Sequence, residues 1–594
     1  MPEKGHPLVE RFDAAVAAVE ARWEELGLQP RRLDRKELAV YRGRAAEKGW
    51  RFAADFPGGL RRLDVIVSAG FPSTPARVAL VDRPPFLTWP HVEKDGVLCL
   101  FPDTTTMSVD DPYDGVASLL GEAFTMVGAA IRGELDGDFR TEFLTYWHHM
   151  ERGGNRTVLT LLDPGPPSRP VRVWEGVSQT VVAENDEQLR AWLRNAAPKV
   201  AALKIKSIAG AFVWLDRVLI PPEYPSSAKD VYALAERAGG TDLLDELARE
   251  TLPRTFVLFG ALAEAGPALA AAVVNRPAVI RGRDPLSAGF RPSAVPEHVV
   301  RARLFGGAPC DRNSVERVDA AWIHGRDRDA RVPRLRNATV AMLGCGSVGA
   351  PVAHALARAG VGKFILVDKQ LMKSANVGRH TLGVQSIDDP KALALAHQLR
   401  VALPHVEVVH HVSEVKELLL RADDPLAGVD LIVSAMGDWP AESLLDEWHA
   451  AQGRLVPIVY GWTEPYAAAG HAIAISAPGD SLRAGLDAYG SPHLVAVTWA
   501  QDPRRYEPAC GAAFDPYGPV ELGFVTSMVA QAALDGLLGR VRSGTHRMWL
   551  ARRAAVEAAG GTWSDELRAV APNALDGATI VERRWGRSAR ILAA

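Results

Sequence analysis

The part of the chain with the clearest chemical character is residues 339–391. An apolar run, Thr339–Leu343, leads into the glycine-rich segment Gly344–Gly349, which is followed by a helical pattern and by a second apolar run ending at Asp368. Glycines after a strand allow a tight turn and the close approach of a phosphate to backbone N–H groups, and the later acid can hold a ribose hydroxyl. The glycines of this pattern are Gly344, Gly346 and Gly349. The segment predicts a nucleotide site, and by itself it fits a dinucleotide oxidoreductase as well as an ATP enzyme.

Polar residues downstream favour ATP over a dinucleotide. Asn376, Arg379 and Lys391 follow Asp368 within a short span, and Asp438 comes after a later apolar run. Hydride transfer to a nicotinamide has no need of two further cations. Displacement of pyrophosphate from ATP builds negative charge on the phosphates, which Arg, Lys and a carboxylate-held metal ion offset.

These elements, in this order, resemble the ThiF/MoeB and ubiquitin-activating superfamily over roughly residues 310–550. The family's adenylation site carries a glycine loop, an Asp, an Asn-x-x-Arg, a Lys and a magnesium-binding Asp. The resemblance implies ATP and Mg²⁺ as cofactors, with Asp368 on the ribose, Asn376, Arg379 and Lys391 on the triphosphate, and Asp438 on the metal. It also implies a homodimer. Many relatives carry two CxxC pairs, and the four cysteines of this chain include none.

A second candidate site lies closer to the N-terminus. The tripeptide Trp89-Pro90-His91 precedes the segment Gly96-Val97-Leu98-Cys99-Leu100. This arrangement resembles the ubiquitin-conjugating fold over about residues 8–150, in which a His-Pro-Asn tripeptide precedes a Gly-x-Ile-Cys-Leu segment with the acceptor cysteine. The resemblance implies that Cys99 takes an acyl group. It also implies that His91, in the place of the family's Asn, donates a hydrogen bond to an oxyanion.

A third candidate is Cys510, in a loop rich in Gly and Pro. Arg504 and Arg505 lie close to it in the sequence, and their charges favour a reactive thiolate. Transfer of an acyl group between two thiols is nearly isoenergetic, so a carboxylate activated as an adenylate can pass to Cys510, then to Cys99, and then to an amine. The sequence therefore predicts an activating and a conjugating enzyme in one chain.

Each of these residues also has a structural interpretation. The glycine loop and Asp368 suit NAD as well as ATP. Asn376 and His91 could be turn residues, Arg379 and Lys391 solvated cations, and Asp438 a helix N-cap. Cys99 could be a buried strand residue, and Cys510 a loop thiol without a role.

Composition limits the class of partner. The chain has 594 residues, and 68 Lys and Arg against 71 Asp and Glu give a formal net charge of −3. No global basic field favours nucleic acid or an anionic membrane. No uninterrupted apolar run approaches the roughly 18 residues of a membrane span, and the first residues do not resemble a signal peptide. We expect a cytoplasmic location.

The fold class expected is α/β with several domains. Residues 1–150 should form the conjugating-like α+β domain, 151–310 an α/β linker domain, and 311–594 a Rossmann-like ThiF adenylation domain with the Cys510 loop. The first boundary rests on residues 151–170, which are rich in Gly, Pro and charge. The middle region has no glycine loop and no motif that carries chemistry.

The functional interpretation is an ATP-dependent ligase similar to the CBASS anti-phage conjugating enzymes. That family attaches the C-terminal tail of a cyclic-nucleotide synthase, or a ubiquitin-like protein, to a target amine. Two alternatives stay open. A sulfur-carrier activating enzyme would adenylate in the same way but end at a persulfide or thiocarboxylate, and a non-catalytic scaffold would only bind nucleotide and a partner's tail.

Overall fold

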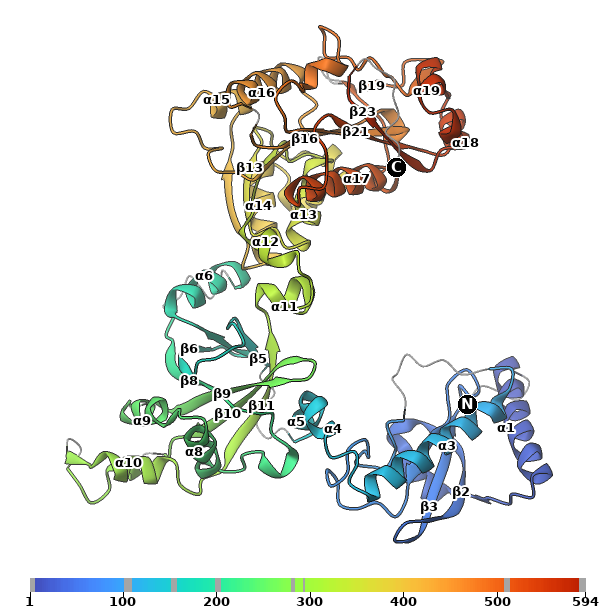
Figure 1. The fold of residues 1–594 in the computed structure, drawn as a ribbon, viewed down its shortest axis with the longest axis vertical. Helices are drawn as coiled ribbons and strands as arrows, with labels where there is room; N and C mark the ends of the chain where they lie inside the picture. The colour runs from blue at the N-terminus through green and yellow to red at the C-terminus, as the bar shows by residue number, and fades with distance from the viewer. Residues whose placement is uncertain are drawn as a thin grey trace. The chain divides into compact units, whose positions relative to one another are not determined.

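The structure is a computed structural model (Figure 1). It describes residues 6–100, 109–150, 157–197, 205–250, 252–278, 284–291, 294–453, 455–506 and 513–586. The chain forms two compact units. Unit 1 comprises Met1–Val158, Pro164–Thr180 and Ile208–Val315, and unit 2 comprises Leu159–Asp163, Val181–Ser207 and Glu316–Ala594. The three-domain division at residues 150 and 310 stays a prediction.

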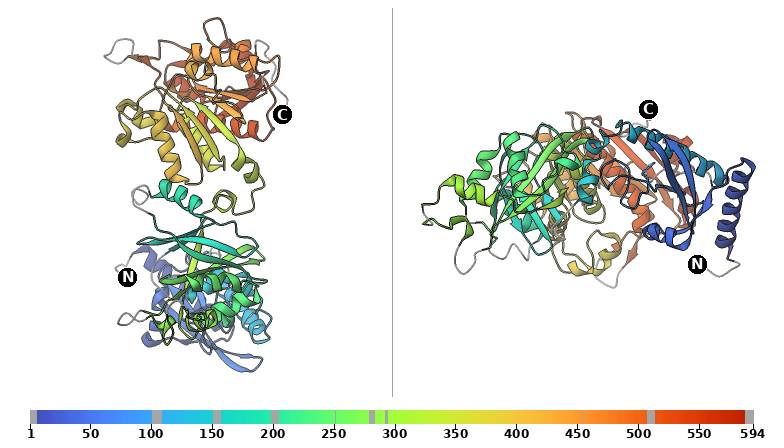
Figure 2. Two further views of the ribbon diagram at one scale, coloured as in Figure 1. Left: turned by 90° about the vertical axis from the view of Figure 1, so that its left-hand side faces the viewer. Right: turned by 90° about the horizontal axis from the view of Figure 1, so that it is seen from below.

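The N-terminal part of unit 1 is a small sheet packed against helices. Strands β1 (Arg31–Arg32), β2 (Ala46–Phe56), β3 (Gly59–Ser68) and β4 (Arg77–Leu80) pair antiparallel in that order. Helices α1 (Pro7–Glu25) and α3 (Pro112–Ile131) share its core, and Figure 2 shows them from two further sides. The sequence predicts α1 from Leu8, Phe12, Val16, Val19 and Trp23. All of them are buried except Leu8, which is 61% exposed.

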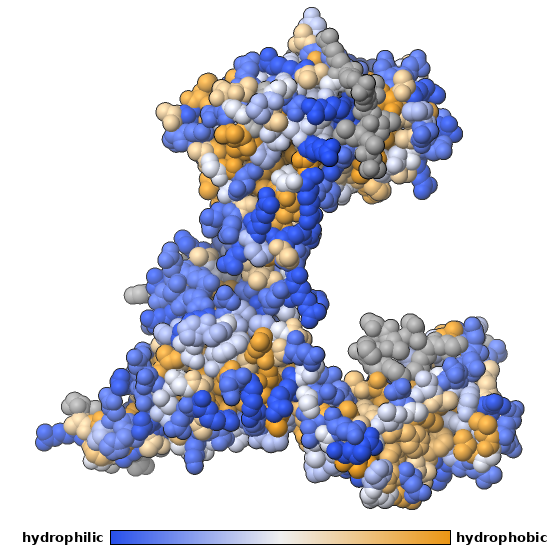
Figure 3. All heavy atoms as spheres, in the orientation of Figure 1, coloured by the Kyte–Doolittle hydropathy of each residue, from blue (hydrophilic) through white to orange (hydrophobic). Residues whose placement is uncertain are grey.

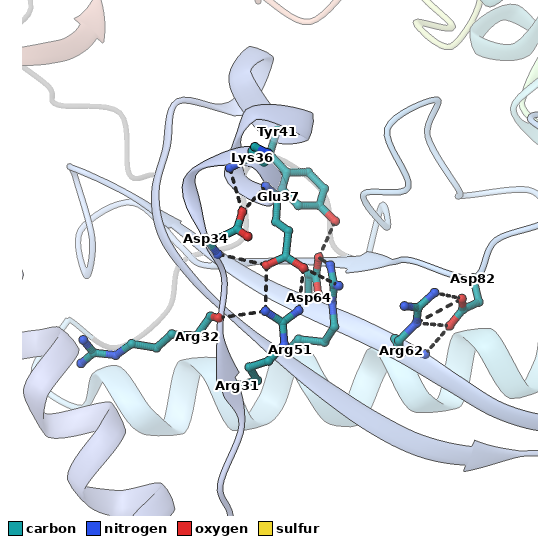
Figure 4. Close-up of polar contacts among 10 residues, drawn as sticks. All are labelled: Arg31, Arg32, Asp34, Lys36, Glu37, Tyr41, Arg51, Arg62, Asp64 and Asp82. Carbon is teal, nitrogen blue, oxygen red and sulfur yellow. Dashed lines mark hydrogen bonds and ion pairs between the residues drawn. The ribbon is translucent and has the colours of Figure 1, made fainter.

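A buried carboxylate ties the loop after α1 to this sheet (Figure 4). Asp64, on β3, is fully buried and accepts hydrogen bonds from the Tyr41 hydroxyl at 2.9 Å and from Arg51 at 2.6 and 2.7 Å. These partners compensate for the loss of hydration that burial of a charge costs. Three residues beyond Tyr41, Arg44 binds Asp95 at 2.9 Å and Glu93 at 2.6 Å. The network therefore braces the loop that precedes Cys99.

Helix α3 is long and apolar enough to cross a membrane by length and composition alone. One face of it, with Val116, Leu119, Ala123 and Val127, is buried in the core against the sheet. In Figure 3 apolar atoms also gather on the outer surface of this domain around α3. A core helix of a folded domain passes the same length and composition test, and the buried face accounts for part of the hydropathy of α3.

The rest of unit 1 is built on a second sheet, whose strands belong to a closed barrel. Strands β6 (Arg169–Glu175), β8 (Ile208–Trp214), β9 (Arg254–Ala263), β10 (Gly266–Asn275) and β11 (Cys310–Arg317) are neighbours in that order, and of these four pairs β8 and β9 run parallel and the others antiparallel. Helices α8 (Ala228–Arg237) and α9 (Thr241–Arg249) pack on it. The short helices α4 (Asp138–Thr141) and α5 (Phe143–His149) join the same core through Phe139, Phe143, Tyr146 and Trp147.

Unit 2 contains an eight-stranded sheet in the order β14-β13-β12-β15-β16-β17-β21-β23. Strands β12 (Thr339–Leu343), β13 (Lys363–Val367), β14 (Glu407–His411), β15 (Leu431–Ser434) and β16 (Ile458–Thr463) pair parallel with their neighbours. Strands β17 (Ala469–Ile475), β21 (Thr545–Leu550) and β23 (Thr579–Arg584) continue it antiparallel. The expected Rossmann-like α/β class of this region is confirmed.

Alternating side chains of this sheet build two cores. Val340 and Met342 of β12 face a cluster with helices α13 (Gly349–Arg358), α14 (Lys391–Ala402) and α17 (Pro519–Leu537). Ala341 and Leu343 face the other side, toward α15 (Val415–Leu419) and α16 (Trp439–Ala451). Helices cover both faces (Figure 1). Near-continuous apolar runs in these strands follow from that double burial.

Candidate functional site

A cavity of about 410 Å³ opens where the central parallel strands of unit 2 end. Its lining includes four of the residues predicted from the sequence: Gly344, Gly346, Asp368 and Asp438. They follow β12, β13 and β15, and β12 lies between the other two. In an open α/β sheet, strand order reverses at such a point and ligands bind outside the carboxyl ends of the strands. The volume is in the usual range for small-molecule sites, about 300–1,000 Å³.

The glycine loop needs its glycines for different reasons. Gly344 has φ of +90°, and a Cβ there would lie 2.6 Å from the carbonyl oxygen of Ala435. A Cβ on Gly349, the first residue of α13, would lie 1.9 Å from the carbonyl oxygen of Gly344. A Cβ on Gly346 would meet nothing within 4 Å, and this residue lines the cavity. Two glycines therefore let the loop close, and the third leaves room for a ligand against the backbone.

Asp368 is tied to the loop by its own hydrogen bonds. Its carboxylate accepts from the backbone N–H of Cys345 at 2.8 Å and from that of Gln370 at 2.7 Å. Lys391, only 5% exposed, donates from Nζ to the side chain of Gln370 at 2.7 Å. Burial lowers the pKa of Lys391, and the Asp368 charge opposes that effect. Lys391 is not among the residues that line the cavity, and neither is Arg379; Lys391 reaches the lining through its hydrogen bond to Gln370.

Arg379 lies against aromatic rings. Its guanidinium is 4.9 Å from the centre of the Tyr517 ring and 5.6 Å from that of Phe514. The Tyr517 hydroxyl is 2.7 Å from the hydroxyl of Ser347, within the glycine loop. Cation–π contacts of this kind hold a guanidinium in place without neutralising its charge. Sequence analysis missed Tyr517, because an aromatic residue 170 positions from the loop follows no motif.

Asn376 and Asp438 also have local structural roles. The Asn376 side chain accepts from the backbone N–H of Lys373 at 3.0 Å within a 3₁₀ turn, Ser374–Arg379. Asp438 caps α16 by accepting from the N–H of Ala441 at 3.3 Å. Asp438 nevertheless lines the cavity, whereas Asn376 is not among the lining residues. Among the described residues, no cluster of three or more His, Cys, Asp or Glu could hold a metal ion alone.

Other residues of the cavity have no sequence signal. Gln370, Ser413, Glu414 and Lys416 line it from the ends of β13 and β14. Below Asp438, the carboxyl group of Glu442 accepts from the Ser434 hydroxyl at 2.9 Å. Burial raises the pKa of Glu442 to about 7, although that hydrogen bond opposes the shift. Glu442 is not a lining residue, whereas Gln370, Ser413, Glu414 and Lys416 share the cavity because β13 and the segment from β14 to α15 end beside each other.

The second candidate site surrounds Cys99, which is exposed. The backbone N–H of Cys99 donates to the carbonyl oxygen of His91 at 2.9 Å, and that of Glu93 donates to Val97 at 2.9 Å. Gly96, with φ of +91°, makes this turn, because a Cβ there would lie 2.6 Å from the carbonyl oxygen of Leu80. His91 itself has a left-handed φ of 59°. The alternative of a buried strand residue for Cys99 is wrong.

The His91 ring belongs to this site as well. A hydrogen bond with the Cys99 side chain, supported by the carboxylates of Asp138 and Glu142, raises the pKa of His91 to about 9 against the effect of burial. The ring therefore lies beside the sulfur, with two carboxylates that favour its protonated form. Cys510, the third predicted cysteine, lies outside the described residues.

Two families match the chain. The ThiF family matches residues 325–555, and prokaryotic E2 family B matches residues 21–153. The chain is a fusion of a ubiquitin-conjugating-like domain with a ThiF-type adenylation domain. The expected class of enzyme, an ATP-dependent adenylyltransferase of the ubiquitin-like activating and conjugating type, is confirmed.

Individual relatives are of three kinds. The ATP-dependent ubiquitin transferase-like protein Cap2 of Pseudomonas aeruginosa (strain BWHPSA011 / Pa011) is 24% identical over 442 residues, which cover 72% of this chain and 74% of that protein. The ubiquitin-like modifier-activating enzyme 5 of Drosophila persimilis is 27% identical, over 34% of this chain and 53% of that protein. The sulfur carrier protein adenylyltransferase of Thermus thermophilus is 30% identical, over 22% of this chain and 46% of that protein.

Proposed function

We propose that this chain activates a protein's C-terminal carboxylate with ATP, carries it as a thioester on Cys510 and then on Cys99, and joins it to a target amine. One observation carries the proposal: a nucleotide-sized cavity lined by Gly344, Gly346, Asp368 and Asp438 occurs in the same chain as an exposed cysteine, Cys99, that lies beside His91.

The residues of the cavity suit ATP. Gly346 leaves open space where phosphate would meet backbone N–H groups, and Asp368 faces the same space. Lys391 and Arg379 would bind the triphosphate and offset the charge that develops as the carboxylate oxygen displaces pyrophosphate. Asp438 would hold Mg²⁺ together with phosphate oxygens and water, because this ion takes few protein ligands at such sites. Mg²⁺, when bound, neutralises charge on the phosphates.

The partner proposed is a protein with a flexible C-terminal tail. A ubiquitin-like protein in this role is supported by the similarity to Cap2, which is named a ubiquitin transferase-like protein. The tail of a cyclic-nucleotide synthase, within bacterial anti-phage defence of the CBASS kind, is the other partner that we propose, on the family resemblance of the sequence alone. The acceptor would be an amine of a protein or small molecule. A cytoplasmic homodimer that binds neither nucleic acid nor membrane completes the proposal.

A sulfur-carrier activating enzyme is the second candidate, because one relative is a sulfur carrier protein adenylyltransferase. The exposed Cys99 and its hydrogen bond with His91 favour conjugation, since an adenylyltransferase that ends at sulfur transfer has no use for a second acceptor thiol.

Pyrophosphate exchange tests the proposal. Full-length protein is incubated with Mg-ATP, labelled pyrophosphate and candidate tails, and exchange that depends on one tail is expected. Asp438→Ala should abolish it without loss of the fold. An adduct that an added thiol releases by thioester exchange but a non-thiol reductant does not, and that Cys99→Ser or Cys510→Ser removes, would place the thioesters. Binding of nucleotide without exchange for any tail would leave only a scaffold.

A further inference from the structure

Three side chains from one short segment surround the His91 ring. Asp138 is the first residue of α4, Glu142 lies between α4 and α5, and Tyr146 belongs to α5. Nε2 of His91 is 2.8 Å from the Asp138 carboxylate, and Nδ1 is 3.5 Å from that of Glu142. The backbone N–H of His91 donates to the Tyr146 hydroxyl at 3.0 Å, and this hydroxyl donates to Glu142 at 3.1 Å. Ring and backbone of His91 are thus both bound.

The strained backbone of His91 indicates that these contacts matter. A left-handed φ is uncommon for a residue with a side chain and costs roughly 1–3 kcal/mol, so the surroundings must hold it. The His91 side chain is 16% exposed, whereas those of Asp138 and Glu142 are 40% and 42% exposed. The imidazole is therefore partly shielded from water, and its carboxylate partners lie at the rim of the site.

The segment that carries the carboxylates is fixed by the second sheet of unit 1. Phe139, Phe143 and Trp147 are buried in its core, and Trp147 donates from Nε1 to the carbonyl oxygen of Asn313 at 3.0 Å. Tyr146 packs edge to face on Phe139, with ring centres 4.8 Å apart. The middle region of the chain, for which the sequence indicates no chemistry, thus positions groups at the Cys99 site.

We propose that Asp138, Glu142 and Tyr146 are positioning residues that hold His91 against Cys99, and that His91 is the base which accepts a proton from the attacking amine. The inference deepens the proposed function and rests on it for the identity of the reaction. A cysteine, a histidine and a carboxylate in this order resemble a catalytic triad, in which the carboxylate orients the imidazole and the imidazole transfers protons in the reaction at sulfur.

The step balances as follows. The amine nitrogen attacks the carbonyl carbon of the Cys99 thioester, and one of its protons passes to the His91 ring. The carbon–sulfur bond then breaks, its electron pair leaves with the Cys99 sulfur, and an amide remains. Acylation of the sulfur removes the contact with Cys99 that contributes most to the raised pKa of His91, while Asp138 and Glu142 remain to stabilise the ring when it accepts the proton of the amine.

The first test does not depend on the acyl donor. Cys99 in the full-length protein is alkylated with iodoacetamide between pH 6 and pH 10, and its peptide is followed by mass spectrometry. A cation beside a thiol favours the thiolate, which is the form that iodoacetamide alkylates. Alkylation of Cys99 at pH 7 should therefore be about fivefold slower in His91→Gln and in Asp138→Asn, and at pH 10 it should approach the wild-type rate. Asp136→Asn, an exposed carboxylate two residues before Asp138, is the matched control.

Cys310 serves as an internal monitor of the fold, because it is 3% exposed and should stay unreactive in every variant. If Asp138→Asn makes Cys310 reactive, Tyr146→Phe is used in its place. This variant keeps the ring in the core but loses the hydrogen bond to the His91 backbone, so alkylation of Cys99 should be two- to threefold slower. The inference would be overturned if the alkylation rate of Cys99 depended on pH as in the wild type both in His91→Gln and in whichever of Asp138→Asn and Tyr146→Phe keeps Cys310 unreactive.

The second test measures transfer of a preformed Cys99 thioester to lysine in single-turnover discharge. His91→Gln and Asp138→Asn should discharge at least about tenfold more slowly, and Asp136→Asn at the wild-type rate. Slower alkylation with normal discharge would refute the role of His91 as a base. If no thioester forms even in the wild type, the proposed function fails, and the alkylation profiles still decide whether the array exists.

Discussion

The closure of the glycine loop leads to a quantitative prediction for Gly349→Ala. A Cβ there would lie 1.9 Å from the carbonyl oxygen of Gly344, against roughly 3.5 Å for ordinary contact, so the loop and the start of α13 must move apart by about 1.5 Å. Both partners are backbone, and neither can rotate away. Misplacement by about 1 Å commonly costs on the order of 100-fold at a site that depends on aligned donors.

Affinity for Mg-ATP, measured by titration calorimetry, should therefore fall about 100-fold in Gly349→Ala, close to 2.7 kcal/mol. Two glycines provide controls. A Cβ on Gly523, within α17, meets nothing within 4 Å, so Gly523→Ala should bind ATP normally. A Cβ on Gly346 is equally free in the protein alone but lines the cavity, so Gly346→Ala should keep the fold and lose affinity. Affinity within about threefold of wild type for Gly349→Ala would refute this account of the loop.

Three further predictions concern the same site. The pKa of Glu442, about 7, is raised above its usual 4.5, so the stability of the wild type should fall relative to Glu442→Gln as pH rises from 4.5 to 7 and stay level above pH 7. Partial exposure of the side chain reduces the expected loss from about 3 to about 2 kcal/mol, a shift in melting temperature on the order of 5 °C. A constant difference in melting temperature between the two proteins at all pH values would contradict this prediction. The pKa of Lys391 is lowered, so the affinity of the wild type for Mg-ATP should begin to decline at a lower pH than that of Lys391→Arg, whose guanidinium stays charged. The same pH dependence of affinity in both proteins would show that Lys391 does not bind the phosphates. Tyr517→Phe keeps the aromatic ring beside Arg379 but loses the hydrogen bond to Ser347, so its affinity for ATP should fall two- to fivefold, whereas Tyr517→Ala should lose at least about tenfold. Equal losses of affinity for the two variants in calorimetric titration would show that the hydroxyl, not the ring, matters.

Much of unit 2 can be predicted from local sequence. The apolar run Thr339–Leu343 coincides with β12, and the helical pattern that follows the glycine-rich segment is α13, Gly349–Arg358. Apolar runs of this length bounded by glycines are typical of strands covered by helices on both faces.

The functional motifs were predicted unevenly, for a physical reason. Gly344, Gly346, Asp368 and Asp438 come together because each lies within four residues of the end of a strand of one parallel sheet, so the motif order places them at one edge. Asn376 and Arg379 follow the same motif but are held by a turn and by aromatic rings. The sequence shows their spacing and not their contacts.

The sequence by itself determined the chemical class of this protein, because glycine spacing and the residues that follow each strand are local properties of the chain. Only the tertiary structure decided which groups serve the two sites. Asp138 lies 47 residues from His91, and Tyr517 lies 170 residues from Ser347, in segments without any motif. Their positions depend on packing of hydrophobic cores elsewhere in each unit, and such packing leaves no periodic pattern around the polar residue that it places.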